Sequence, residues 1–249
     1  MTDLFSFETN AYLLAAIGSF LLGIAKSGVK GIAVLIVVLF VYAFGAKAST
    51  GILMPLLICG DIFAILYYKK HADWSYVVKL FPWMALGVIF GAYGGGFLDE
   101  EAFKLGMAGL ILITTILLFY WEQNPQKPLD SSKLFVGITG ILAGFTTMIG
   151  NLAGAFTNIY FLAIRLPKNT FIGTSAFVFF LINLFKVPFH VWVWGTITPY
   201  SIQTSLQYIP YLMVGLLLGV HLVKKINNER YRKLILMLTA IGAVLLFFR

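Results

Sequence analysis

The stretch GIAKSGVKG, residues Gly23–Gly31, joins two short apolar segments at 12–25 and 32–46. Neither segment reaches the roughly 20 residues that a helix needs to cross the ~30 Å hydrocarbon core of a bilayer. Irregular backbone at that depth is tolerated only where it is buried in protein or lines a water-filled cavity. The stretch therefore predicts a break between two membrane helices, which either cross fully or form a re-entrant hairpin.

A second glycine-containing stretch, GFTTMIGNLAG at Gly144–Gly154, joins the short segments 134–149 and 152–164. Longer apolar segments are found at 50–68, 77–98, 102–121, 170–192, 203–223 and 231–248. Hydrophobic residues make up 60% of the chain and charged residues only 11%, more apolar surface than a soluble domain of 249 residues can hide. The sequence predicts an all-α polytopic membrane protein.

Charge and cysteine content exclude several other classes. The net charge is +8, but the basic residues lie singly or in short clusters between apolar segments, so we expect no nucleic-acid partner. The single cysteine, Cys59, rules out a disulfide framework. Residues 1–8 carry Asp3 and Glu8 and no basic side chain, unlike a cleaved signal peptide, so we expect the first apolar segment to be retained.

The two halves of the chain repeat with matched spacing. Gly51 and Asp61 are ten residues apart, as are Gly173 and Asn183. The same intervals recur in two further sets, Pro82, Gly87 and Gly91 in one half and Pro210, Gly215 and Gly219 in the other. Agreement at this many positions indicates duplication. The predicted units are a first transmembrane repeat at 1–121, a cytoplasmic linker at 122–133 and a second repeat at 134–249.

The distribution of basic residues gives an orientation. With the N-terminus outside and all ten segments crossing, the cytoplasmic side receives all of the 18 basic residues except Lys47, Lys104, Lys186 and Arg249. The acidic loop Asp99–Glu101 then lies outside, whereas the corresponding loop of the second half, Asn227–Lys233, lies inside and is basic. Opposite bias at equivalent loops predicts two inverted-topology repeats, each with glycine-broken or re-entrant short helices.

The two breaks are candidate anion-binding elements. Each ends in a new helix N-terminus, whose free N–H groups and positive dipole end favour an anion. The candidate substrate-binding residues are Lys26, Ser27, Gly28, Lys30 and Gly31 in the first break and Thr146, Thr147, Gly150, Asn151 and Gly154 in the second. The alternative is that both lysines extend to a cytosolic loop and that the glycines only allow close packing.

Three more polar residues interrupt apolar helices. Asp61 is an intramembrane carboxylate, which is a functional hypothesis by default. It could pair with Lys26 or Lys30, carry a proton for coupled transport, or serve a structural hydrogen-bonding role together with Asn183. Lys186, one turn after Asn183, could face a cavity or extend outward.

The sequence contains no recognisable catalytic or metal-binding arrangement. Its histidines, His71, His190 and His221, are far apart, and no zinc-peptidase, nucleophile-elbow, phosphate-loop or dinucleotide motif is present. We therefore expect no enzyme activity, no metal and no cofactor.

The motifs together resemble the TauE/SafE sulfite exporter family. Those that carry the resemblance are Ala25–Gly31, Gly45–Thr50, Met54–Asp61 and Tyr67–Trp74 in the first half, and Ala143–Thr147, Leu166–Lys168, Gly173–Ala176 and Asn183–Lys186 in the second. The resemblance covers nearly the whole chain. It implies a bacterial-type inner-membrane permease that exports sulfite, sulfoacetate or a related sulfur-containing anion.

The sequence departs from the glycine-triplet-and-proline form of many members at both breaks. Val29, Lys30 and Gly31 follow Gly28, and Asn151, Leu152, Ala153 and Gly154 follow Gly150. These departures fall where the ligand is expected.

These observations predict a secondary transporter in which the two breaks meet near the middle of the membrane around a small anion. Rocking of the halves would give alternating access. The alternative is an anion-selective channel or passive pore, which uses similar donors and dipole ends. The expected partners are the lipid bilayer and a small-molecule anion, and the protein is expected to be a monomer or a homodimer.

Overall fold

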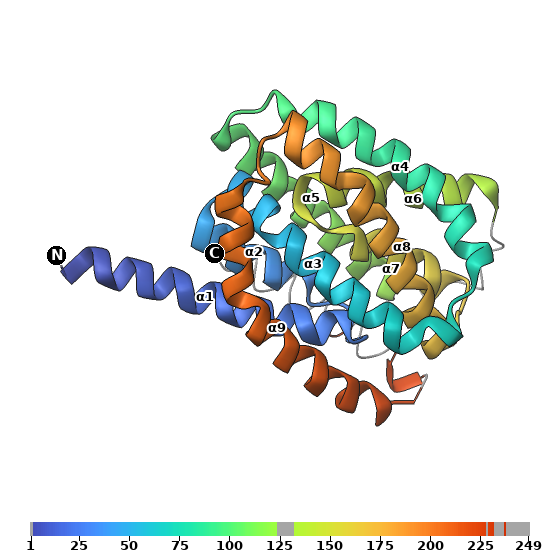
Figure 1. Ribbon diagram of the computed structural model, residues 1–249. Coiled ribbons are helices and arrows are strands. Elements are labelled where there is room, and N and C mark those ends of the chain that lie inside the picture. Colours follow the sequence, from blue (N-terminus) through green and yellow to red (C-terminus); the bar gives the residue numbers. More distant parts are fainter. Residues whose placement is uncertain (1, 124–131, 228, 232–236, 238–249) are drawn as a thin grey trace.

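The computed structural model describes residues 2–123, 132–227, 229–231 and 237, and in these residues it contains helices and no strand (Figure 1). The α-helices are α1 (Thr2–Lys26), α2 (Ala33–Phe44), α3 (Ala46–Tyr68), α4 (Trp74–Gly96), α5 (Glu100–Gln123), α6 (Lys133–Gly150), α7 (Ala153–Ala163), α8 (Lys168–Pro188) and α9 (Pro199–Lys224). A 3-10 turn, η1 (Lys69–His71), follows α3, and a π-helical turn, η2 (Phe189–Val193), follows α8. The all-α prediction is confirmed. Most of the tenth predicted segment, 231–248, lies outside the described residues.

Five of the described helices are long and apolar enough to cross a membrane. They are α3 with η1, α4, α6, α8 with η2, and α9. The sequence grouped α6 with the short segments, but at 18 residues it reaches this length. Large apolar side chains on the outer faces of α4 and α9 are exposed, among them Val78, Phe90 and Leu217. Apolar faces of this kind are stable in contact with the lipid of a bilayer.

The first break forms the tip of a hairpin. α1 and α2 pack against each other through Gly18 and Phe40, and the connecting residues 26–30 are all buried. α2 has 12 residues and extends about 18 Å at ~1.5 Å per residue, which is little more than half of a bilayer core. The short length of α2 fits the re-entrant alternative, whereas α1, which contains the first short segment, has 25 residues. Lys26 and Lys30 are buried inside the protein at the tip of this hairpin.

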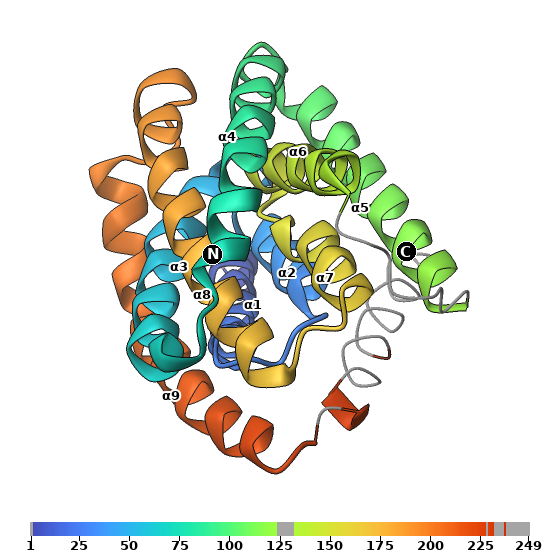
Figure 2. The same ribbon diagram turned by 90° about the vertical axis from the view of Figure 1, so that its right-hand side faces the viewer.

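The second break has the same form. α7, with 11 residues, returns along α6, and the rings of Phe135 and Tyr160 lie 5.9 Å apart. The tip is buried from Thr146 to Gly150. Figure 2 shows α2 and α7 in the interior of the bundle, with α4, α5 and α9 around them.

Each hairpin packs closely on a long helix from the other half of the chain. α1 lies against α9, where a Cβ added to Gly23 would be 2.2 Å from the carbonyl oxygen of Leu212. α6 lies against α4, where a Cβ added to Gly144 would be 1.9 Å from the carbonyl oxygen of Met84. Neither position has room for a side chain, so glycine is required at both for this approach of the two backbones.

The helices α3 and α8 pack against each other. Gly51 near the start of α3 faces the carbonyl oxygen of Thr196, which follows α8. Gly173 near the start of α8 faces the carbonyl oxygen of Tyr68, the last residue of α3. The same two helices carry Asp61 and Asn183 into the interior, beside the hairpin tips.

Candidate functional site

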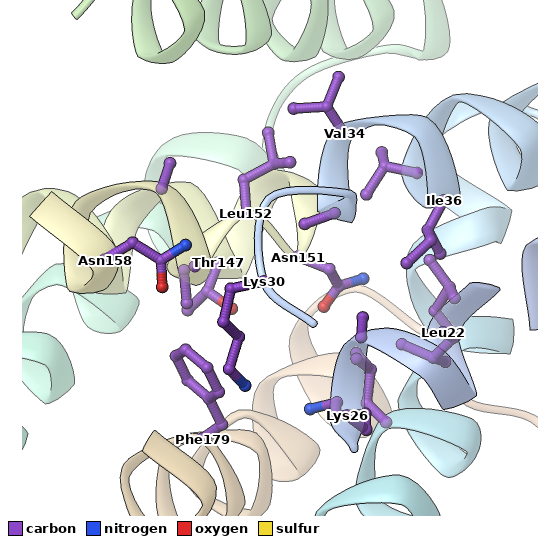
Figure 3. A pocket seen from close by; sticks show the side chains of 18 of the residues that line it. Leu22, Lys26, Lys30, Val34, Ile36, Thr147, Asn151, Leu152, Asn158 and Phe179 are labelled. Carbon is purple, nitrogen blue, oxygen red and sulfur yellow. The ribbon is translucent and has the colours of Figure 1, made fainter. Parts of the chain in front are cut away.

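A cavity of about 90 Å³ lies between the two hairpin tips (Figure 3). We call it the central cavity. The tips contribute Lys26, Lys30, Gly31, Thr147, Asn151 and Gly154 to its lining. The first turns of α2 and α7 also line it, through Ala33, Val34, Ala153 and Ala155. Two helix N-termini with their positive dipole ends therefore face the same cavity.

The first tip depends on glycine and on tyrosine hydroxyl groups. Gly28 and Gly31 have φ values of 124° and 103°, which side-chain-bearing residues rarely adopt. The hydroxyl of Tyr68 donates to the carbonyl of Ser27 at 2.8 Å, and that of Tyr231 donates to the carbonyl of Gly28 at 2.6 Å. These bonds satisfy backbone groups that the break leaves without a helical partner.

Lys26 at the end of α1 pairs with Asp61 of α3. Its Nζ donates to Asp61 Oδ1 at 2.5 Å, and Asn183 Nδ2 donates to Asp61 Oδ2 at 2.7 Å. Asp61 is fully buried, and both of its carboxylate oxygens are therefore bonded. Of the two lysines that the sequence offered as partners, Lys26 makes the ion pair.

Lys186 of α8 continues this network to the second tip. Its Nζ donates to Asn151 Oδ1 at 2.6 Å, to Thr147 Oγ1 at 3.2 Å and to Asn183 Oδ1 at 3.3 Å. The side chain is fully buried, so the outward-facing alternative for Lys186 is wrong. The chain of contacts runs from α1 through α3 and α8 to the second tip.

Lys30 differs from the other two buried lysines. Its side chain is 7% exposed, and its Nζ lies 5.3 Å from the centre of the Phe179 ring. Within the described part of the chain, no oxygen accepts a hydrogen bond from it. An isolated buried charge is costly. The central cavity thus contains one ammonium group whose counter-charge is missing from the described residues.

The second tip is closed by its own backbone. Asn151 adopts a left-handed conformation with φ 56°, and its N–H donates to the carbonyl of Thr147 at 3.0 Å. Leu152 N–H donates to the carbonyl of Thr146 at 3.3 Å. Asn151 Nδ2 is buried and has no bonding partner among the described residues, and the same is true of Asn158 Oδ1.

The central cavity receives most of the predicted binding residues, but not all. Ser27, Gly28, Thr146 and Gly150 are outside its lining. The hydroxyl groups of Ser27 and Thr146 donate to carbonyls of their own helices, Ile24 at 2.7 Å and Leu142 at 2.7 Å. The possible coupling residue Asn183 lines the cavity, whereas Asp61 and Lys186 lie behind it.

The lining residues that the sequence analysis did not single out include one polar and one aromatic side chain, Asn158 and Phe179. Asn158 is a polar residue in the apolar segment 152–164, and that isolation was a usable signal. Phe179 is one of 23 phenylalanines in an apolar chain, and nothing in the sequence distinguishes it.

One protein family, described as Sulfite exporter TauE/SafE, matches residues 13–246 of the chain. The match spans both hairpins and the helices between them. No curated protein and no solved structure matches the chain closely enough to serve as a comparison.

Proposed function

The chain belongs to the TauE/SafE sulfite exporter family, and on this premise we propose that it is a secondary transporter. Its cargo is a small sulfur-containing anion such as sulfite, sulfoacetate or another organosulfonate. It exports this anion across the inner membrane by alternating access. The family is one of membrane transporters, and the five long apolar helices fit a multi-pass membrane protein.

The observation that carries the anion assignment is the environment of Lys30. Its ammonium group borders the central cavity and has no acceptor among the described residues. The N-terminal turns of α2 and α7 add positive dipole ends to the same space. A bound anion would satisfy both. The candidate binding residues are Lys26, Lys30, Gly31, Thr147, Asn151 and Gly154.

The proposed mechanism uses two inverted repeats, 1–121 and 134–249, joined by a cytoplasmic linker at 122–133. Matched contacts support it: Gly23 of α1 meets α9 as Gly144 of α6 meets α4. Gly51 of α3 likewise meets Thr196, which follows α8, as Gly173 of α8 meets Tyr68 at the end of α3. In this scheme the two hairpins take turns in closing the central cavity from opposite sides of the membrane.

In this scheme Asp61 has two candidate roles, one structural and one in proton coupling, and transport measurements distinguish them. It fixes Lys26 at the cavity wall through the 2.5 Å ion pair. It is also the buried acidic residue of the described chain and therefore the candidate for carrying a coupling proton. Asp61→Asn should abolish pH-gradient-driven uptake if Asp61 carries the proton, and should leave the pH dependence unchanged if its role is structural.

The test is flux of radiolabelled sulfite, sulfoacetate, sulfate and acetate into proteoliposomes, with and without a pH gradient. We expect saturable uptake that is stimulated by the same anion on the opposite side. Lys30→Gln should reduce uptake at least tenfold. Lys70→Gln removes the same charge from an exposed position and is the matched control.

Three results would contradict the proposal. Uptake of a cation or neutral solute with no movement of any anion would refute the anion assignment. A large linear conductance would favour the channel alternative. Unchanged anion uptake by the folded Lys30→Gln protein would remove the observation on which the assignment rests.

A further inference from the structure

Lys186 of α8 is a fully buried lysine to which the proposed transport mechanism gives no role. Its Nζ donates to Asn151 Oδ1 at 2.6 Å, to Thr147 Oγ1 at 3.2 Å and to Asn183 Oδ1 at 3.3 Å. An ammonium group has three N–H donors and no acceptor, so these three oxygens use its whole hydrogen-bonding capacity. Lys186 is also outside the lining of the central cavity. It therefore has no N–H group left for a direct bond to the cargo.

The ammonium group of Lys186 determines which way the two neighbouring amides point. A side-chain amide accepts hydrogen bonds at its oxygen and donates them at its nitrogen, whereas an ammonium group only donates. The oxygens of Asn151 and Asn183 therefore face Lys186, and their NH₂ groups face away from it. The reverse orientation would place N–H groups against N–H groups. A side chain at position 186 that also accepts, such as glutamine, would permit both orientations.

In Asn183 both ends of the amide have a partner in the protein. Nδ2 donates to Asp61 Oδ2 at 2.7 Å, and Oδ1 accepts from Lys186. The amide thus lies between a carboxylate that only accepts and an ammonium group that only donates, and its orientation is fixed from both sides. Asn183 lines the cavity, but these hydrogen bonds are directed to the protein.

In Asn151 only one end of the amide has a partner. Oδ1 accepts from Lys186, whereas Nδ2 is buried and donates to no atom of the described residues. Asn151 lines the central cavity at the second tip, and Figure 3 shows its amide among the lining side chains. A buried N–H group without an acceptor costs free energy comparable to a lost hydrogen bond. An oxygen atom of a bound anion would be the acceptor that this group lacks.

We infer that Lys186 is a positioning residue, which holds the amide of Asn151 so that its NH₂ group donates to the bound anion. This donor lies at the position of the second tip that corresponds to Lys30 in the first tip. The cargo is thus bonded by an ammonium group from one tip and by an oriented amide from the other. The inference rests on the proposed function and adds to it the residue that orients one of the binding groups.

The experiment is a double-variant cycle on the KM of uptake into proteoliposomes, with labelled sulfite or sulfoacetate, whichever is transported faster. Lys186→Gln lets the Asn151 amide turn and should raise KM about tenfold, as expected for one lost hydrogen bond to a charged group. Asn151→Gly removes the amide, suits the backbone φ of 56° at this position and should raise KM by a similar factor. Because Lys186 acts through that amide, the double variant should lie within about threefold of Asn151→Gly alone.

Two further variants separate orientation of the amide from stability and from charge in general. Asn151→Asp gives Lys186 a counter-charge and removes the NH₂ group. It should raise KM at least about tenfold and yet unfold at no lower temperature than wild type. A purely structural role would make transport and stability change together. Lys70→Gln removes an exposed lysine and should leave KM unchanged, both alone and combined with Asn151→Gly.

The failures of the two proposals can be told apart. If the two losses multiply in the double variant, to about a hundredfold, Lys186 acts on the anion by itself, and this inference is overturned while the proposed function stands. Undiminished uptake by Asn151→Asp would show that no donor is needed there, with the same consequence, whether or not Lys186→Gln folds. Absence of any anion transport by the wild-type protein overturns both proposals.

Discussion

The two hairpin tips have the same backbone plan and different chemistry. The first tip has left-handed glycines at Gly28 and Gly31, carries two lysines, and is held by tyrosine hydroxyl groups from other segments. The second tip has one left-handed residue, Asn151, closes through its own backbone, and contains no charged side chain. Its positive charge comes from Lys186 of α8.

The chemical difference between the two tips can be stated residue by residue. Counted from Gly23 and Gly144, Lys26 corresponds to Thr147 and Lys30 corresponds to Asn151. All four of these side chains line the central cavity. The two hairpins therefore show that the same backbone arrangement is compatible with charged side chains on one tip and neutral ones on the other.

The largest expected effect comes from breaking the ion pair that only the first tip possesses. Asp61→Ala leaves Lys26 buried without a counter-charge and should destabilise the protein by about 3–5 kcal/mol. The free energy of unfolding in mixed detergent micelles, followed by tryptophan fluorescence, measures this loss. The double variant Asp61→Leu with Lys26→Met should recover most of it. Thr147→Ala, at the position that matches Lys26, should lower stability by less than half as much. Equal losses for the two single changes would contradict the asymmetry.

An intermediate effect should be the same for both hairpins, because their packing is alike. Gly23→Ala and Gly144→Ala each place a methyl group against a backbone oxygen, and each should lower the unfolding free energy by about 1–3 kcal/mol. Gly94→Ala is the control, since a Cβ there meets nothing within 4 Å. If one hairpin tolerates alanine and the other does not, the two are not packed equivalently.

The smallest expected effect tests the difference in the hydrogen bonds that stabilise the two tips. Tyr68→Phe removes the hydroxyl group that donates to Ser27 and should lower stability by about 1 kcal/mol. Amide hydrogen exchange should become faster in residues 26–31 and stay unchanged in 146–152, because the second tip needs no outside donor. Tyr67→Phe, at a side chain 41% exposed, is the matched control. Faster exchange at both tips would show that they open together.

The sequence was sufficient for the helical class and for the position of both breaks, because hydropathy and glycine spacing are properties of the chain itself. It also singled out Asp61 and Asn183, which lie in contact. It could not choose between Lys26 and Lys30 as the partner of Asp61, since a turn of irregular backbone separates them. It did not decide whether Lys186 points into the protein or outward, because either direction suits a long side chain near a helix end. Asn158 and Phe179 become cavity residues only through the way α7 and α8 pack, which no spacing along one chain reveals.

The hydrogen bond between Asp61 and Asn183 has a consequence for how the chain is built. In the proposed inverted repeat, Asp61 and Asn183 occupy matching positions and touch each other, which places them at the axis that relates the two halves. In a pair of identical, separate subunits, such a residue would face its own copy, and two aspartates would repel each other there. A single chain that contains both halves is free to place a carboxylate on one side of the axis and an amide on the other. In the proposed inverted repeat, this carboxylate–amide contact therefore depends on the two halves differing in sequence within one chain.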